Sequence, residues 1–181
     1  MKPDDHTALQ EKARQIRMII LDVDGVLTDG RLIYDNEGEE YKAFNSRDGH
    51  GIRMLLEAGI QPALLTGRKS TLVLHRAENL GISPELIYQG YRDKRPAFAE
   101  LCAKTGIKPE EIAYVGDDVI DLPVMTKVGL AVAVQDAHWF VKQHADWITE
   151  TPGGRGAVRE VGEFLLDAQG KLQDMLQGYL K

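Results

Sequence analysis

Cysteine and long apolar runs are the scarcest features of this 181-residue sequence, which contains one cysteine, Cys102. A single cysteine excludes an internal disulfide framework. No run approaches the ~20 consecutive apolar residues that a membrane-spanning helix needs. The opening segment, MKPDDHTALQEKAR, is polar and lacks the apolar core of a secretory signal. We therefore expect a soluble, cytoplasmic protein that has no membrane partner.

Basic residues are also in short supply, with 22 Lys and Arg against 28 Asp and Glu, for a formal net charge of -6. This excess of acid argues against a protein that binds nucleic acid through its overall field. The chain has no internal repeat, no low-complexity tract and no Pro/Gly-rich linker, so we expect a single domain over residues 1–181. Acidic residues cluster while Lys and Arg recur in connecting segments, a mixture that suits a bound metal and an anionic small molecule.

Short apolar runs alternate with amphipathic stretches, which predicts an α/β fold with a doubly wound parallel sheet. Such sheets bind ligands at the carboxyl ends of their strands. The predicted strands are Met18–Leu21, Ala63–Leu65, Leu86–Tyr88, Ile112–Val115, Leu130–Val134 and, more weakly, Trp147–Thr149. The predicted helices that end at a glycine are Gly49–Ala58, Ser70–Leu80 and Asp93–Thr105.

Two segments depart from this alternation. Residues 30–45 place a turn-like Asp-Asn-Glu-Gly between two segments in which apolar and polar residues alternate, which predicts a projecting β-hairpin. Residues 151–181 contain a glycine-rich Gly-Gly-Arg-Gly and a helical pattern at Ala157–Ala168. We interpret them as a C-terminal tail, and expect a chain without residues 151–181 to remain folded.

Carboxylates follow two of the predicted strands directly. Asp22 and Asp24 end the first run and, with side chains alternating at period two, point the same way if the strand continues. An aspartate is ionised at neutral pH and can attack phosphorus without a base, but its repulsion from a phosphate dianion calls for a hard cation. Asp117, with Asp118 and Asp121, follows the fourth run, and clustered carboxylates bind Mg²⁺ through oxygen.

Two further residues complete a phosphate-transfer set, although each has an ordinary reading. Thr66 follows the second run in Thr-Gly-Arg, where a hydroxyl and free backbone N–H groups would hold phosphate oxygens. Lys94 begins a predicted helix and would neutralise both phosphate and nucleophile. Taken alone, Thr66 is a common strand residue, Lys94 is a solvated lysine, and Asp-x-Asp-Gly is a turn. Their order and their placement after strands favour the catalytic interpretation.

In this order, the four segments resemble the motifs of the haloacid dehalogenase superfamily over nearly the whole chain. The resemblance implies that Asp22 is the nucleophile that becomes an aspartyl phosphate. Asp24 would protonate the leaving oxygen and later activate water. Mg²⁺ would be held by Asp22, the Asp24 backbone carbonyl and Asp117, with Asp118 and Asp121 in support.

The segments LDVDGVLTDG, AFNSRDGHGI, LLTGRKS, YVGDDVIDLPVM and GGRGAVREV resemble, more narrowly, the phosphatases of 3-deoxy-D-manno-octulosonate 8-phosphate, which serve lipopolysaccharide precursor synthesis. That resemblance implies a sugar site, to which Asp24 and Lys94 would also contribute. Its other residues would be Asn45, Ser46, Arg47, Asp48, Gly49, Arg53, Arg68 and Arg76. Guanidinium groups suit a substrate with two anionic ends, because they bind carboxylates and phosphates with paired donors.

No gap between the motifs has room for a separate lid domain, so cover for the site must come from another subunit. The resemblance implies a homotetramer built through the hairpin and a tail that reaches a neighbouring site. We therefore expect Leu32, Tyr34 and Tyr41 to contribute to the interface and Arg155 to bind substrate or release product.

Three other functions compete with this interpretation. A phospho-accepting receiver domain also uses a strand-end Asp, an acidic pair, a Thr and a Lys, but there the acidic pair precedes the acceptor, whereas Asp22 comes first here. A regulatory domain would not need the complete set of motif residues. A phosphatase for nine-carbon ulosonate 9-phosphates remains an open alternative, because sequence does not measure one carbon of sugar length.

Overall fold

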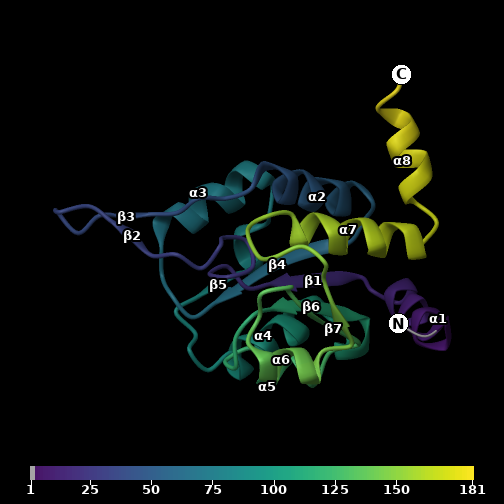
Figure 1. Cartoon of the computed structure of the whole chain (residues 1–181), viewed down its shortest axis with the longest axis horizontal. Coiled ribbons are helices and arrows are strands. Elements are labelled where there is room, and N and C mark those ends of the chain that lie inside the picture. The colour runs from purple at the N-terminus through teal and green to yellow at the C-terminus, as the bar shows by residue number, and fades with distance from the viewer. Residues whose placement is uncertain (1–2) are drawn as a thin grey trace.

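A parallel six-stranded sheet forms the centre of the computed structural model, which describes residues 3–181 (Figure 1). The strand order is β5-β4-β1-β6-β7-β8, so the first strand lies in the middle of the sheet. The strands are β1 (Met18–Leu21), β4 (Gln61–Thr66), β5 (Ile87–Gln89), β6 (Ile112–Gly116), β7 (Leu130–Ala133) and β8 (Trp147–Ile148). The predicted α/β class and parallel sheet are confirmed.

Helices cover both faces of the sheet (Figure 1). On one face lie α2 (Ser46–Glu57), α3 (Thr71–Leu80) and α7 (Ala157–Ala168), and on the other α4 (Arg95–Thr105), α5 (Leu122–Met125) and α6 (Trp139–His144). The remaining helices are α1 (Pro3–Arg14), α8 (Leu172–Gly178) and the 3-10 turns η1 (Pro84–Leu86) and η2 (Pro109–Glu111). Among the described residues, no helix is long and apolar enough to cross a bilayer.

The strands at the middle of the sheet read as continuous apolar runs because both of their faces are covered. All four residues of β1 are buried, as are all five of β6. Two helices end at the glycine that the sequence predicts. Gly81 caps the C-terminus of α3 with φ of 81°, and Gly106 caps that of α4 with φ of 67°. A residue with a Cβ rarely adopts this left-handed conformation.

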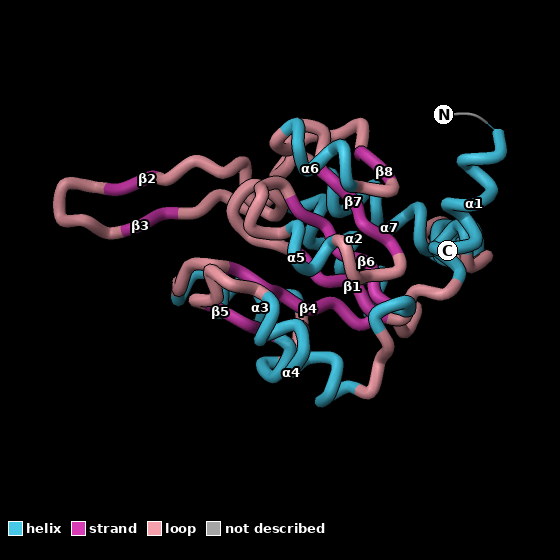
Figure 2. Tube along the Cα trace, turned by 90° about the horizontal axis from the view of Figure 1, so that it is seen from below, coloured by secondary structure: helices cyan, strands magenta, loops and turns pink. Residues whose placement is uncertain are grey.

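The predicted hairpin extends away from the sheet (Figure 2). Its strands, β2 (Ile33–Tyr34) and β3 (Glu40–Tyr41), pair antiparallel with Ile33 opposite Tyr41. Leu32, Ile33, Tyr34 and Tyr41 are all exposed in the single chain. The apolar surface of the hairpin therefore faces solvent in the part of the chain that the structure describes.

The C-terminal part of the chain differs from the expected tail. Helix α7 packs on α2, and its Val158, Val161 and Leu165 are fully buried in the core. Deleting residues 151–181 would therefore remove core side chains, each contributing ~1.5–3 kcal/mol of hydrophobic stabilisation. The prediction that such a truncation stays folded is wrong. Within residues 151–181, the helix without a buried residue is α8, and it extends away from the body (Figure 1).

The N-terminal segment also differs from its interpretation as merely polar. Residues Pro3–Arg14 form helix α1, and Leu9 and Ala13 are buried in the core. Apolar residues spaced four apart lie on one face of a helix, a short signal that the many polar neighbours conceal.

Candidate active site

The carboxyl end of β1 places Asp22 at the centre of the site. The Asp22 N–H donates to Val115 O at 3.1 Å, which continues the pairing of β1 with β6, and the side chain is buried. The chain then turns tightly, with the N–H groups of Leu27 and Thr28 both donating to Val23 O at 3.0 Å. Gly25 has φ +102°, and a Cβ there would lie 2.1 Å from Asp117 Oδ2. Only glycine lets this turn approach the second acidic strand end.

A buried network joins the first strand end to β6 and α4. Lys94, fully buried at the start of α4, donates from Nζ to Asp121 Oδ1 at 2.6 Å and lies 2.9 Å from Asp22 Oδ1. The Tyr114 hydroxyl donates to the same Asp121 oxygen at 2.6 Å. The other Asp121 oxygen accepts from the N–H groups of Asp117 and Asp118 at 3.0 and 3.1 Å. Asp121 therefore fixes both the lysine and the acidic loop.

The electrostatics of this cluster favour a cation. Burial, followed by the charge of Asp121, raises the pKa of Asp22 to about 7. Burial and the charges of Asp22 and Asp121 raise the pKa of Asp117 to about 8. Burial opposes the charge on Lys94, but Asp22 and Asp121 raise its pKa overall. One ammonium group therefore does not balance the buried carboxylates.

The donor set fits a hard divalent ion. Asp22, Asp117 and Asp121 each place a carboxylate oxygen within 4.8 Å of the others. Asp117 Oδ1 is buried, and no hydrogen-bond partner for it exists among the described residues. Because Asp121 is already occupied by Lys94 and Tyr114, the oxygens free to bind metal belong to Asp22 and Asp117. The division into metal ligands and supporting residues stays a prediction.

A cavity of about 180 Å³ opens over these carboxylates. Its lining residues are Asp22, Asp24, Thr66, Gly67, Arg68, Asp117, Asp118 and Ile120. Thr66 is buried at the end of β4, and its Oγ1 accepts from Arg68 N at 3.4 Å. The predicted catalytic and metal residues are thus brought together, with Lys94 just beneath Asp22.

Asp24 is held by a cation that sequence reasoning missed. Lys42, from the base of the hairpin, forms a short ion pair with Asp24 Oδ1, and only 2% of its side chain is exposed. Arg68 lies 4.0 Å from Asp24 Oδ2 and donates at 2.7 Å to both Tyr34 Oη and Glu40 Oε1. Apolar and polar residues alternate along the hairpin, so Lys42 is expected on the face opposite to that of its apolar neighbours. The sequence does not show which face of the hairpin turns toward the site.

Most predicted sugar-binding residues lie outside this cavity. Asn45 caps α2 by accepting from Arg47 N at 2.8 Å. Buried Asp48 accepts from Gly156 N at 3.2 Å and from Arg159 N at 2.9 Å. These contacts join the start of α2 to the start of α7.

The remaining predicted sugar residues form a neighbouring group. Arg53 donates to Asn79 O at 2.6 Å, and Arg76 donates to Asn79 Oδ1 at 3.1 Å. Gly49 gives Arg76 room, because a Cβ there would lie 2.2 Å from its Nη2. Exposed Ser46 begins α2. The structure therefore does not bring these residues to the phosphate-sized cavity of the same chain.

Arg155 lies in a loop that packs on the catalytic turn. Gly154 N donates to Val26 O at 2.8 Å, and Arg155 donates to Asp29 Oδ2 at 3.2 Å. Arg155 and Arg47 also line a separate cavity of about 280 Å³. This loop contacts the active site of its own chain, whereas the sequence interpretation directed it to a neighbour.

Comparison with known proteins agrees with this geometry. Residues 87–160 match the haloacid dehalogenase-like hydrolase family. The 3-deoxy-D-manno-octulosonate 8-phosphate phosphatase KdsC of Salmonella typhi is 55% identical over 168 residues, covering 93% of this chain and 88% of that protein.

Two solved structures share the fold. The phosphatase of this name from Yersinia pestis has a TM-score of 0.89 and 50% identity, over 92% of this chain and 89% of that one. The Moraxella catarrhalis phosphatase, in complex with magnesium ion, phosphate ion and KDO, has a TM-score of 0.91 and 41% identity, over 94% and 97%. The chain therefore belongs to the 3-deoxy-D-manno-octulosonate 8-phosphate phosphatase family of haloacid dehalogenase-like hydrolases.

Proposed function

We propose that this phosphoric monoester hydrolase converts 3-deoxy-D-manno-octulosonate 8-phosphate into the free sugar acid and phosphate, a step of lipopolysaccharide precursor synthesis. The observation that carries the proposal is the buried Asp22 carboxylate, 2.9 Å from Lys94 Nζ, at the floor of a cavity of about 180 Å³. That space suits a phosphoryl group. The identity with relatives of this name supports the choice of sugar.

We assign one residue to each step of the proposed reaction. An Asp22 oxygen attacks phosphorus and the bond from phosphorus to the sugar oxygen breaks, which leaves an aspartyl phosphate. Lys94 offsets the negative charge that gathers as nucleophile and phosphate meet. Asp24 gives a proton to the leaving sugar oxygen. Asp24 then takes a proton from water as the water oxygen attacks phosphorus, and Asp22 and phosphate are released.

Phosphate oxygens find donors around the cavity rim. Thr66, Gly67 and Arg68 line the space in which the phosphoryl group would sit, so the Thr66 hydroxyl would be one donor to it. Arg68 supplies a guanidinium group on the same side. Lys42 and Arg68 together hold the Asp24 carboxylate at the cavity, so the residue that transfers protons is oriented before substrate arrives.

The cofactor that we propose is Mg²⁺, held by Asp22, Asp117 and the Asp24 backbone carbonyl, with Asp118 and Asp121 in support. The unpaired, buried Asp117 Oδ1 supports this assignment. When bound, the ion would offset the repulsion between carboxylate and phosphate and polarise the phosphoryl oxygens.

Assembly into a homotetramer would cover the open site. The hairpin carries exposed Leu32, Tyr34 and Tyr41, and Arg68 joins its Tyr34 and Glu40 to the active-site rim. Contact between hairpins of neighbouring chains would therefore affect the position of residues that contact Asp24. The residues implied for the sugar, from Asn45 to Arg76 and Arg155, would complete the site together with a neighbouring chain. We further propose a cytoplasmic location, in keeping with the lone unpaired cysteine.

Trapping the covalent intermediate tests the proposal. Acid quenching of native enzyme with radiolabelled substrate should leave label on the protein, whereas Asp22→Asn should give neither label nor turnover while its circular dichroism shows a folded protein. Asp167→Asn, an exposed carboxylate-to-amide change far along α7, is the matched control. Substantial turnover by Asp22→Asn would exclude the covalent route.

A substrate comparison decides between the two sugar lengths. We expect a higher kcat/KM for the eight-carbon 8-phosphate than for nine-carbon ulosonate 9-phosphates. The reverse preference would assign the enzyme to the nine-carbon substrate while leaving the Asp22 chemistry intact.

A further inference from the structure

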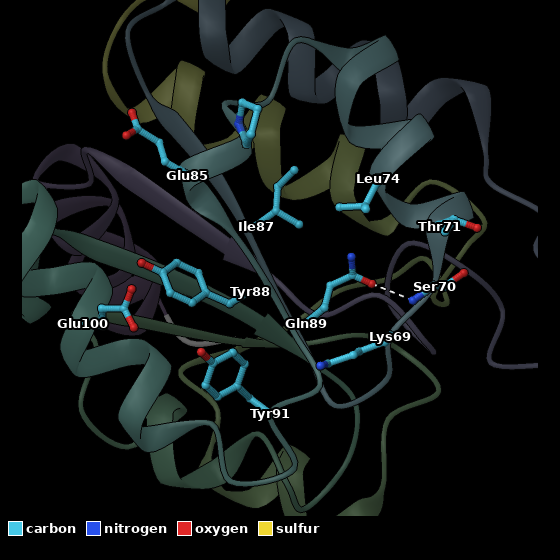
Figure 3. Close-up of a pocket in the computed structure, with 11 residues that line it drawn as sticks. Lys69, Ser70, Thr71, Leu74, Glu85, Ile87, Tyr88, Gln89, Tyr91 and Glu100 are labelled. Atoms are coloured by element: carbon cyan, nitrogen blue, oxygen red, sulfur yellow. Dashed lines mark hydrogen bonds between the residues drawn. The ribbon is translucent and has the colours of Figure 1, made fainter.

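A second, larger cavity lies at the β5 edge of the sheet, between the start of α3, η1 and α4 (Figure 3). Its volume is about 620 Å³, and it shares no lining residue with the catalytic cavity. Leu74 and Ile87 line one side of the cavity, and Glu100 and Lys69 lie apart from each other along it (Figure 3). A volume of this size holds a small organic molecule.

One end of the cavity is anionic and aromatic. The Tyr88 hydroxyl is buried, with the residue 6% exposed, and has no hydrogen bond of good geometry to any described residue. Burial and the nearby Glu100 carboxylate raise the pKa of Tyr88, so the hydroxyl stays protonated. Tyr91 packs edge-to-face on Tyr88, with ring centroids 6.0 Å apart. Glu100 forms no ion pair within the described part of the chain. The Glu100 carboxylate, which lies near the Tyr88 hydroxyl, therefore gives this end of the cavity its negative charge.

The opposite end presents hydrogen-bond donors. The Lys69 side chain lies against Gly90, where a Cβ would be 2.6 Å from Lys69 Cε, so glycine allows the chain to lie flat along the rim. Gln89 Oε1 accepts from Ser70 N at 2.7 Å, which fixes the amide and leaves its NH₂ group to donate. Figure 3 shows Lys69 and Gln89 on the side of the cavity away from Glu100.

We propose that this cavity is a binding site for a small organic zwitterion. The ammonium group of the ligand donates to Glu100 and lies beside the two tyrosine rings, which attract cations. A short apolar chain covers Leu74 and Ile87. The anionic group, a carboxylate, accepts from Lys69 and Gln89. The site is independent of the phosphatase reaction, because the two cavities have no residue in common.

A probe with both charged ends tests the site on the full-length enzyme. Titration of 6-aminohexanoate, followed by amide NMR, should shift the signals of Tyr88, Gln89 and Tyr91 and saturate with a Kd on the order of 1 mM, as expected for so small a ligand. Hexanoate and hexylammonium, which keep the chain but only one charge, should each bind at least about tenfold more weakly.

Variants at the two ends separate their contributions. Glu100→Gln should reduce the affinity for 6-aminohexanoate to that for hexanoate, and Lys69→Met should reduce it to that for hexylammonium. Both residues are exposed, so both variants should fold; Glu78→Gln, exposed on α3 outside the cavity, is the control. Absence of saturable shifts at these residues would overturn the proposal, as would equal binding of the single-charge probes or an affinity unchanged by Glu100→Gln.

Discussion

Replacing Asp117 with asparagine should separate the stability of this protein from its metal binding. The Asp117 carboxylate lies among Asp22, Asp121 and Asp118, and burial followed by these charges raises its pKa from 3.8 to about 8. An amide keeps the shape of the side chain and removes the charge. We expect Asp117→Asn to be more stable than the native protein without Mg²⁺ and to lose the response to Mg²⁺.

The sign and size of this difference in stability follow from proton binding. Between pH 3.8 and about 8, the folded protein without metal holds a proton on this carboxyl that the unfolded chain has lost. Its free energy of unfolding therefore falls as pH rises through that window, by ~1.4 kcal/mol per pH unit for one full proton. At neutral pH the free energy of unfolding is therefore lowered by at most ~4 kcal/mol. Sharing of the proton with Asp22 reduces this loss to roughly 2–4 kcal/mol. The melting temperature of Asp117→Asn should rise by about 4–16 °C.

Thermal unfolding followed by circular dichroism, with chelator and with excess Mg²⁺, measures both effects. In chelator, the stability gain of Asp117→Asn should grow from about pH 5 to about pH 8 and vanish near the ordinary carboxyl pKa. Mg²⁺ should raise the melting temperature of the native protein and of Asp167→Asn, but not that of Asp117→Asn. An Asp117→Asn protein that is less stable than native in chelator at the upper pH, or that responds normally to Mg²⁺, would refute the reasoning.

Four further predictions concern other parts of the molecule. Asp24→Asn should slow the hydrolysis of alkyl phosphates, including the sugar phosphate, far more than that of aryl phosphates, whose leaving groups need no proton. Equal slowing of both classes in a steady-state assay would show that Asp24 is not the general acid. Lys94→Met should abolish turnover and lower the free energy of unfolding in urea by ~3–5 kcal/mol, because it leaves Asp22 and Asp121 without their buried cation; a stability equal to native would contradict the network. Leu32→Asp with Tyr41→Asp should give a folded monomer in sedimentation if the hairpin forms the interface, and an unchanged mass would exclude it. A chain ended after Gly170 should fold and hydrolyse an aryl phosphate normally, with a changed KM or kcat for the sugar phosphate only if α8 takes part; loss of folding would contradict the exposure of α8.

The sequence predicted the middle of the sheet well because the central strands are buried on both faces. Such strands read as uninterrupted apolar runs, and the structure places each predicted strand within a few residues of its expected range. Short elements were missed for a physical reason. Helix α5 spans only Leu122–Met125 and α6 only Trp139–His144, and less than two turns carries no helical periodicity.

The catalytic residues were predictable because each follows a strand, and parallel strands end at a common edge. Long-range contacts were not predictable in the same way. Asp48 accepts hydrogen bonds from Gly156 N and Arg159 N, more than 100 residues later in the chain. No local pattern shows that pairing, so the sequence did not reveal that Asp48 also joins α2 to α7. The Lys42 contact with Asp24 escaped notice for a similar reason, since it depends on how the hairpin folds back.

The packing of the Gly153–Gly154 loop on the catalytic turn determines when during synthesis the active site can form. A Cβ on Gly153 would lie 1.7 Å from Gly25 O, so the two backbones are in direct contact across more than 120 residues of sequence. Strand β1 likewise needs β6, which is translated long after it. A nascent chain that has emerged only as far as β7 carries Asp22, Lys94 and Asp117 but lacks this support. Phosphatase activity should therefore appear late on the ribosome, only after α7 has emerged and docked.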